Sequence, residues 1–429
     1  MKPTLNITLA LIALSGSTFA MGICPPTELI DPAPQDTVVK DREGCAHPVI
    51  QQQISIDVVF VLDTTGSMGG LIEGAKQKIW AIANQISQAQ QTPTIRFGLV
   101  GYRDRGDDYV TTMTALTEDI DTVYADLMNY KAQGGGDTPE SVNEALFAAV
   151  ERFDWSPQDG SLKLIYLVGD APPKMGYKDD VKYQASCRLA YEQGININTI
   201  QCGSLRGTKE IWQEIAQLAN GAYAAIEQNG GVVAISTPYD EQLTKLDSDI
   251  RATMLDYGDS EVFAYQANKR ALSGSISSNA APEAAADRAV YNLSDAGRRN
   301  MLGKQELVDD IANGVIDFEE IINDQLPKEL QSLTDEELKE EVERRQAKRA
   351  DLSRTIKEIA AKRAAYLLAN QPVSAKDGFD QKVLEALVEQ GARVGIEFKS
   401  DKSQSKSQSK TKGESKEEPK DKPIEPTDD

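Results

Sequence analysis

The sequence Val-Phe-Val-Leu-Asp-Thr-Thr-Gly-Ser-Met, residues 59–68, decides the fold. The apolar residues before Asp63 belong to a run over 54–62, and this run predicts a buried β-strand. The turn that follows carries Asp63, Thr65 and Ser67 at alternate positions, and an amphipathic helix begins at once. One carboxylate and two hydroxyls are the hard oxygen ligands that Mg²⁺ prefers. The segment therefore predicts a cation site at the end of a strand.

Two later segments are candidates to complete this set of oxygen ligands. Thr138 lies in Gly-Gly-Gly-Asp-Thr-Pro-Glu, residues 134–140, between two predicted helices. Asp170 follows a second buried strand, in Leu-Val-Gly-Asp-Ala-Pro-Pro, residues 167–173. Ligands of open parallel sheets bind beyond the carboxyl ends of the strands. Because Asp63 and Asp170 both follow such ends, these two residues are expected to meet.

This pattern resembles the metal-ion-dependent adhesion site of the von Willebrand factor type A family. The family pattern is Asp-x-Ser-x-Ser, then a distant Thr in a Gly-rich loop, then an Asp at the end of a strand. The chain has Asp63-x-Thr65-x-Ser67, in which a threonine replaces one serine and retains the hydroxyl. The resemblance covers residues 54–250. It implies an α/β fold with a doubly wound, mainly parallel sheet and helices on both faces.

The resemblance also implies the metal and the role of each ligand. The five positions are Asp63, Thr65, Ser67, Thr138 and Asp170, with Mg²⁺ as the expected ion and Mn²⁺ or Ca²⁺ as alternatives. The hydroxyls would bind directly and the two aspartates through water. Neutral direct ligands leave the metal electrophilic, so an Asp or Glu from a partner protein would complete its coordination. The expected function is metal-dependent protein binding, without enzymatic activity.

The loops around this site are expected to choose the partner. The expected rim combines the Gly-rich loop with the end of the strand beside the first one, and consists of Gly135, Gly136, Asp137, Arg103 and Asp104. The tripeptide Arg105-Gly106-Asp107 is also an integrin-ligand motif. A tripeptide arises by chance too readily to carry a function by itself.

Other interpretations explain parts of the same pattern. Residues 63–67 resemble the phosphorylated Asp-Lys-Thr-Gly-Thr loop of haloacid-dehalogenase-like phosphotransferases, and residues 168–170 resemble their Gly-Asp metal motif. That motif should continue with a second acid, whereas Ala-Pro-Pro-Lys follows here. An aspartic protease needs two Asp-Thr-Gly or Asp-Ser-Gly motifs, and the chain lacks both. A scaffold acting through its C-terminal helices is a further alternative. Taken singly, the site residues could also be helix caps.

Composition restricts the partners and the location. A net charge of −21 argues against nucleic acid and against anionic lipid. The single histidine, His47, lies outside every motif, which argues against His-based hydrolases and zinc sites. Residues 1–20 predict a secretory signal, with Lys2, a short apolar core and a Thr-Phe-Ala cleavage site. The mature protein is expected to be exported, periplasmic or secreted, without a membrane span.

Four cysteines in an exported chain would allow two disulfides. Cys24 and Cys45 enclose a Pro-rich segment and are the expected pair. Cys187 lies in the middle of a predicted helix and Cys202 ends the next strand, so their heights differ by roughly 10 Å. A disulfide needs Cα atoms within about 7 Å. This second pair is open between a disulfide and two buried thiols.

The rest of the chain divides by composition. The expected organisation is a signal peptide (1–20), a loop-like segment (21–53), the α/β domain (54–250), a helix with an Ala- and Ser-rich linker (251–286), a charged helical region (287–398) and a disordered tail (399–429). Within the charged region, Thr334 opens a capping box before a long helix. A second helix covers Phe379–Gln390. These two are candidates for an antiparallel coiled-coil-like hairpin.

Overall fold

The computed structural model describes residues 38–40, 46–48, 54–89, 93–136, 138–157, 161–232, 234–370 and 378–398 of the 429-residue chain. The chain divides into two units, residues 1–52 and 53–429. In the first unit, β1 (Val38–Lys40) pairs with β2 (Ala46–Pro48) in an antiparallel ladder. The predicted signal peptide, the predicted Cys24–Cys45 disulfide and the predicted C-terminal tail lie outside the described residues.

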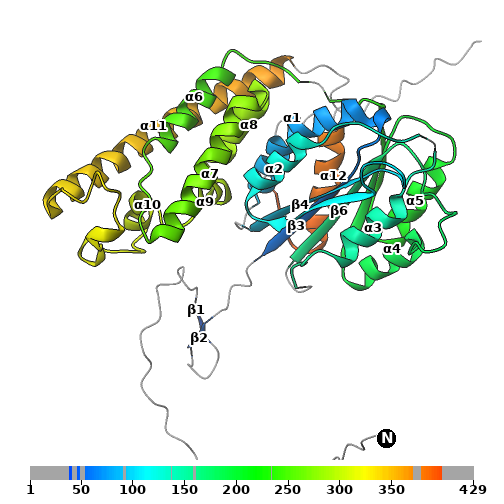
Figure 1. Cartoon of the computed structure of the whole chain (residues 1–429), viewed down its shortest axis with the longest axis horizontal. Coiled ribbons are helices and arrows are strands. Elements are labelled where there is room, and N and C mark those ends of the chain that lie inside the picture. Colours follow the sequence, from blue (N-terminus) through cyan, green and yellow to red (C-terminus); the bar gives the residue numbers. More distant parts are fainter. Residues whose placement is uncertain are drawn as a thin grey trace, which may run out of the picture. The chain divides into compact units, whose positions relative to one another are not determined.

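The second unit is built around a six-stranded sheet (Figure 1). Its strand order is β5-β4-β3-β6-β7-β8, and every neighbouring pair is parallel except β4 with β5, which is antiparallel. The strands are β3 (Ser55–Asp63), β4 (Thr94–Tyr102), β5 (Thr111–Thr117), β6 (Ser161–Gly169), β7 (Ile195–Cys202) and β8 (Tyr223–Ile226). The predicted doubly wound, mainly parallel sheet is confirmed.

Helices cover both faces of the sheet because its central strands are apolar on both sides. Phe60 and Leu62 of β3 pack into one layer, and Val59 and Val61 pack into the other. The first layer contains α1 (Gly69–Ile86) and α2 (Ile120–Asn129), and the second contains α3 (Val142–Glu151), α4 (Tyr183–Glu192) and α5 (Thr208–Leu218). A 3₁₀ turn, η1 (Gly66–Met68), leads into α1.

The strand register places the predicted site at one edge of the sheet. Asp63 pairs with Tyr102 on β4, and Leu62 pairs with Val168 on β6. The carboxyl ends of these three central strands are therefore level with one another. The loops that carry the expected ligands all leave from this edge.

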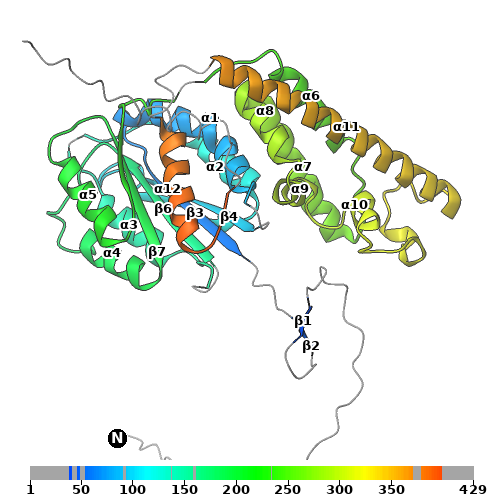
Figure 2. The same ribbon diagram turned by 180° about the vertical axis from the view of Figure 1, so that it is seen from behind.

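Eight helical elements follow the sheet before the chain returns to it. They are α6 (Asp240–Arg251), α7 (Ser260–Asn279), α8 (Pro282–Tyr291), α9 (Asp295–Leu302), α10 (Leu307–Ala312), the 3₁₀ turns η2 (Phe318–Glu320) and η3 (Asn323–Gln325), and α11 (Asp335–Asn370). We call these elements the helical arm. Within it, α11 packs along α6, and α8 packs against α6 (Figures 1 and 2).

The predicted linker within 251–286 is wrong, because α7 and the first half of α8 occupy it. Asp259 caps α7 by accepting from two backbone N–H groups, and Pro282 occupies the first turn of α8. Alanine has the highest helix propensity, so its abundance here favoured a helix and not a loop. Ala284 and Ala286 are fully buried, and their small side chains allow α8 to pack closely against α1 and α6.

The predicted hairpin of the last two helices is also not formed. The final helix, α12 (Phe379–Arg393), leaves α11 and packs on β6 and β7 beside α1 (Figures 1 and 2). Phe379 stacks at a tilt on Phe60 of β3, with ring centroids 6.0 Å apart. Because α12 completes the first layer, the helical arm is an insertion into the α/β fold, and α12 adds to that layer from beyond the segment predicted at 54–250.

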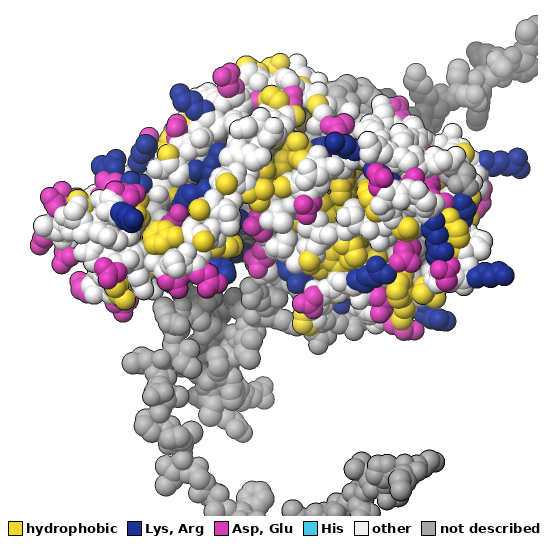
Figure 3. Space-filling model, in the orientation of Figure 1, with side chains coloured by type: hydrophobic (Ala, Val, Ile, Leu, Met, Phe, Trp, Pro, Cys, Tyr) yellow, Lys and Arg dark blue, Asp and Glu magenta, His cyan; other side chains and the backbone are white. Residues whose placement is uncertain are grey.

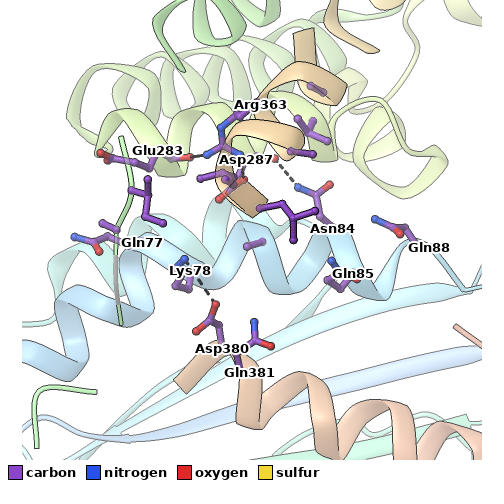
Figure 4. Close-up of a pocket in the computed structure, with 18 residues that line it drawn as sticks. Gln77, Lys78, Asn84, Gln85, Gln88, Glu283, Asp287, Arg363, Asp380 and Gln381 are labelled. Atoms are coloured by element: carbon purple, nitrogen blue, oxygen red, sulfur yellow. Dashed lines mark hydrogen bonds and ion pairs between the residues drawn. The ribbon is translucent and has the colours of Figure 1, made fainter. Parts of the chain in front are cut away.

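Buried ion pairs fasten the helical arm to the α/β domain. Arg288 of α8 donates two hydrogen bonds to the carboxylate of Asp121 on α2, at 2.8 and 2.7 Å. A groove next to α1 is lined by residues of α1, the arm and α12, and within it Asn84 of α1 donates to the carbonyl of Asp287 at 2.8 Å (Figure 4). Arg363 of α11 pairs with the same Asp287. Polar contacts that are buried or half-buried therefore join the arm to helices α1 and α2.

The structure also decides the second cysteine pair. Cys187 on α4 and Cys202 on β7 are both buried, free thiols, so the candidate disulfide between them is not formed. Cys187 lies within the second helix layer, whereas Cys202 packs on the first layer, on the opposite face of the sheet. Burial raises the pKa of both thiols, and for Cys187 it raises the pKa to about 12.

The surface and the helices show two further general features. On the face shown in Figure 3, acidic and basic side chains are interspersed. Within the described ranges, every helix is too short or too polar to cross a bilayer.

Candidate metal centre

Asp63 ends β3 and is fully buried. Its Oδ1 accepts hydrogen bonds from the backbone N–H of Thr65 at 2.9 Å and from the Thr65 hydroxyl at 2.6 Å. Its Oδ2 is buried and has no hydrogen-bond partner among the described residues. Burial raises the pKa of Asp63 to about 7, the hydrogen bonds from Thr65 lower it, and the charge of Asp170 adds to the rise. Asp63 thus has one oxygen that accepts hydrogen bonds and one oxygen without a partner among the described residues.

Thr65 and Ser67 lie on the turn that follows, as the sequence predicts. The Oγ1 of Thr65 is 3.4 Å from the Oγ of Ser67. Thr65 is buried, whereas Ser67 is exposed. Because α1 begins only at Gly69, with Met68 as its N-cap residue, neither Asp63 nor Ser67 caps that helix. The interpretation of these residues as caps of α1 is therefore wrong.

The Gly-rich loop approaches this turn closely. The carbonyl of Gly134 accepts a hydrogen bond from the N–H of Gly66 at 3.2 Å. Gly135 has a φ of +74°, and a Cβ atom on it would lie 2.8 Å from the Cβ of Thr65. Only glycine combines this backbone conformation with such a close approach. The glycines therefore bring Thr138 to the same edge as Thr65, although 73 residues separate them in the printed sequence.

Thr138 does not cap a helix. The helix predicted from Pro139 begins at Val142, because residues before it are held in a loop. The N–H of Glu140 donates to the carbonyl of Pro172 at 3.0 Å, and the N–H of Lys174 donates to the carbonyl of Glu140 at 2.8 Å. This bridge joins the Gly-rich loop to the loop after Asp170. It leaves Thr138 exposed at the site.

Asp170 follows β6, as predicted, and lies beside the end of β7. Its Oδ2 accepts a hydrogen bond from the side-chain amide of Gln228 at 2.7 Å. Its carbonyl accepts from the hydroxyl of Thr208 at 3.0 Å, and Thr208 is the first residue of α5. Gln228 follows β8, so a further loop contributes to the site. Sequence reasoning did not identify Gln228, because no pattern distinguishes it from a surface glutamine.

The structure adds a third carboxylate, Glu140, which sequence reasoning placed only in the Gly-rich motif. Its side chain is 4% exposed, and its Oε2 is buried without a hydrogen-bond partner among the described residues. Burial raises the pKa of Glu140 to about 8, and the charges of Asp63, Asp104, Asp107 and Asp170 add to the rise. In the sequence, the feature that points to Glu140 as a site residue is its position two residues after Thr138.

A trough joins these residues at the surface. Its volume is about 700 Å³, and it is lined by Thr65, Gly66, Ser67, Gly135, Gly136, Thr138, Glu140, Asp170, Ala171, Ser204, Leu205 and Gln228. We call it the site trough. Four of the five predicted ligands line it, and the fifth, Asp63, lies beneath it, bonded to Thr65. Of the predicted rim, Gly135 and Gly136 line it, and Asp137 lies outside the described residues.

Arg103 and Asp104 do not form an exposed rim, because both are 3% exposed. Arg103 donates to the carbonyls of Thr64 and Lys131, at 3.2 and 2.9 Å. Asp104 accepts hydrogen bonds from Ser141 and Lys174, at 2.7 and 2.9 Å, and from the hydroxyl of Tyr177. These bonds lower the pKa of Asp104 against the opposing effect of its burial, which is the largest single influence. The two residues hold the site loops together from below.

The donors present fit a hard divalent cation. Two buried carboxylate oxygens, Oδ2 of Asp63 and Oε2 of Glu140, lack partners within the described part of the chain, and leaving such groups unpaired is costly. Hydroxyls of Thr65, Ser67 and Thr138 lie at the same edge. The set is all oxygen, which suits Mg²⁺, Mn²⁺ or Ca²⁺. Within the described ranges, no group of three or more His, Cys, Asp or Glu side chains is placed to hold a metal by itself.

Comparison with known proteins matches the segment that forms the sheet and its covering helices to one protein family. Residues 57–238 match the family model described as the von Willebrand factor A domain. Von Willebrand factor A domain-containing protein 7 of Rattus norvegicus is 33% identical over 136 residues, which are 31% of this chain and 14% of that protein. The chain thus spans about one seventh of the length of this curated relative.

Two solved structures each match 42% of the chain. One is proximal thread matrix protein 1 from the mussel byssus, with a zinc-occupied MIDAS motif, which is 16% identical and has a TM-score of 0.32. The match covers 42% of this chain and 44% of the mussel protein's chain. The pilus adhesin SpaC from Lactobacillus rhamnosus GG, in its open conformation, is 14% identical, covers 42% of this chain and 29% of its own, and has a TM-score of 0.33.

Proposed function

Residues 57–238 form a von Willebrand factor A domain, and from this premise we propose that the chain is a metal-dependent protein-binding module and not an enzyme. The observation that carries the proposal is the pair of buried carboxylate oxygens on Asp63 and Glu140 that have no hydrogen-bond partner among the described residues. They lie at the one edge where the hydroxyls of Thr65, Ser67 and Thr138 also converge. A cation would compensate both carboxylates and complete the set.

Each residue has a defined role in this proposal. Ser67, Thr65 and Thr138 supply neutral oxygens, and Asp63 fixes the Thr65 hydroxyl through its 2.6 Å hydrogen bond. Asp170 is oriented by Gln228. A divalent cation bound here, most simply Mg²⁺, would accept a further oxygen from an Asp or Glu of the partner. The glycine-rich floor of the site trough leaves room for that side chain.

Charge explains why the metal would control binding. The described residues that line the site trough include Glu140 and Asp170 but no Lys, Arg or His. An acidic partner would therefore be repelled by the metal-free site, because like charges at close range are unfavourable. The same lining disfavours the phosphotransferase interpretation, which requires a lysine beside the phosphorylated aspartate.

Calorimetric titration of Mg²⁺ and Mn²⁺ into the full chain tests the metal site. Wild type is compared with Asp63→Asn, which preserves the side-chain shape, and with Thr138→Val, which removes only the hydroxyl. Weaker binding in both variants is expected, because both side chains supply or orient ligands. Loss in Asp63→Asn alone would favour the phosphotransferase, and a wild type that binds neither ion would overturn the proposal.

We also propose that the protein is exported, on the basis of the signal-like residues 1–20. Expression in a Gram-negative host, followed by fractionation and mass measurement, tests this. A periplasmic product that lacks the first 20 residues supports export. A full-length product confined to the cytoplasm contradicts it.

A further inference from the structure

The loop between β7 and α5 raises one large apolar side chain beside the site trough. The loop covers residues 203–207, and the glycines at its two ends have φ angles of +69° and +87°. The N–H of Gly203 donates to the carbonyl of Ile226 at 2.9 Å, which fixes the start of the loop on β8. Between the glycines, Leu205 lines the site trough and is 44% exposed.

Leu205 differs from the other residues that line the site trough. The remaining described lining residues are glycine, alanine or polar, so Leu205 is the one large apolar side chain among them. Single exposed leucines are common and need no explanation by themselves. Leu218, at the far end of α5, is exposed to 42% and illustrates this. What distinguishes Leu205 is that it lines the same trough as four of the predicted ligands.

We propose that Leu205 forms an apolar subsite next to the metal, and that the partner segment carries a large aliphatic side chain two positions from its Asp or Glu. This inference rests on the proposed function. Side chains two residues apart in an extended segment point to the same face and are roughly 6.6 Å apart. The acidic side chain would enter the site trough while the aliphatic one covers Leu205. The glycines Gly66, Gly135 and Gly136 leave the floor open to the segment's main chain.

The contact of the partner carboxylate with the metal and the contact of the aliphatic side chain with Leu205 have different roles. The carboxylate contact depends on the metal, because Glu140 and Asp170 make the metal-free site trough acidic. The aliphatic contact depends on water leaving two apolar surfaces, so it does not require the metal. Leu205 therefore selects among acidic segments that all satisfy the metal. Removing either apolar side chain should weaken binding by about tenfold, the effect of burying one to two methylene groups.

The test uses synthetic peptides displayed on a biosensor and the full chain in solution. Leu-Gly-Asp and Asp-Gly-Leu peptides are compared with Ser-Gly-Asp and Asp-Gly-Ser, in saturating Mg²⁺ and in chelator. Leu205→Ser is the test variant. Leu218→Ser is its matched control, because it makes the same change at an equally exposed leucine at the opposite end of α5. Mg²⁺ affinity of each variant is measured by calorimetry.

The expected result is Mg²⁺-dependent capture of the leucine peptides by wild type and by Leu218→Ser, with about tenfold weaker capture by Leu205→Ser at unchanged Mg²⁺ affinity. The serine peptides should bind all three proteins equally weakly. Mg²⁺-dependent capture could be equally strong for leucine and serine peptides and for wild type and Leu205→Ser. That result would overturn the apolar subsite but not the proposed function. Absence of Mg²⁺-dependent capture of every acidic peptide would count against the proposed function itself.

Discussion

Asn198 on β7 and Gln390 on α12 exchange two side-chain hydrogen bonds, of 3.1 and 2.6 Å, across 192 residues of sequence. Both side chains are buried. Asn198 also accepts from the N–H of Ala222 at 2.9 Å, so the pair connects α12 to the start of β8. This contact shows that the last helix belongs to the sheet, and that the helical arm between β8 and α12 is an insertion.

Breaking this pair should loosen α12. Gln390→Ala leaves the amide of Asn198 buried without its partner, which costs about 1–3 kcal/mol in the free energy of unfolding. Denaturant unfolding of the full chain measures the cost. Gln381→Ala, at a half-buried glutamine on the same helix, is the control and should change stability little. Equal stability of the two variants would show that the pair does not hold α12.

Asp104 should set the metal affinity without touching the metal. Its bonds to Ser141 and Lys174 connect the residues after Glu140 to the loop after Asp170. Asp104→Asn weakens the bond to the Lys174 ammonium, so Mg²⁺ affinity measured by calorimetry should fall roughly tenfold, as for groups that orient ligands.

A matched control lies at the other end of the same strands. Asp57 of β3 accepts two hydrogen bonds from Arg96 of β4, at 2.9 and 2.8 Å. Asp57→Asn and Asp104→Asn each weaken one half-buried ion pair, so they should lower the free energy of unfolding by similar amounts. Only Asp104→Asn should also lower Mg²⁺ affinity. If the two variants lower Mg²⁺ affinity alike, Asp104 acts only through general stability.

Glu140→Gln should have opposite effects on stability and on metal binding. Above about pH 8, where Glu140 is ionised, the amide removes a buried charge that lies near the carboxylates of Asp63 and Asp170, so the metal-free protein should melt at a higher temperature. It also removes an anionic oxygen from the site, so Mg²⁺ affinity should fall by roughly 10- to 100-fold. Thermal melts with and without Mg²⁺ measure both. A variant with unchanged Mg²⁺ affinity would exclude Glu140 from the site.

The metal-free protein should lose stability as the pH rises. The folded state raises the pKa of Asp63 to about 7 and of Glu140 to about 8, above the value of about 4 in an unfolded chain. Their contribution to stability is therefore fully present below about pH 4 and is lost as the pH rises through about 7 to 8. The melting temperature in chelator should fall across this interval, and saturating Mg²⁺ should reduce the fall.

Glu140→Gln provides the control for this pH dependence, because it removes one of the two titrating groups. Its melting temperature in chelator should vary less with pH than that of wild type. A wild-type melting temperature that is flat or rising from about pH 5 to about pH 8.5 would contradict the assignment of these two carboxyls.

Arg288 should be essential to the attachment of the helical arm. It is 2% exposed and pairs with Asp121, which is also buried. Arg288→Met leaves the Asp121 carboxylate buried without its partner, at a cost of about 3–5 kcal/mol in the free energy of unfolding. The double variant Arg288→Met, Asp121→Leu removes both charges and should recover most of that loss. Failure of the double variant to recover would assign the effect to packing.

Local pattern was enough to predict the sheet. Each buried strand is a short apolar run, and the observed β3 spans Ser55–Asp63, where the apolar run over 54–62 predicts a strand. The placement of Asp63 and Asp170 at strand ends also followed from order along the chain. By contrast, Arg103 and Asp104 were assigned to the rim because position along a strand does not reveal what covers its end.

By itself, the sequence determined that a parallel sheet would bring Asp63, Thr65, Ser67, Thr138 and Asp170 to one edge. For Asp63, Thr65, Ser67 and Asp170, such a prediction needs only local periodicity and the rule that parallel strands end together, whereas for Thr138 it needs the resemblance to a known family. The tertiary structure decided that Oε2 of Glu140 is buried without a partner among the described residues, that Asp104 holds the loops, and that α12 returns to the sheet across the helical arm. These depend on contacts between residues far apart in the chain, and no local pattern records such contacts.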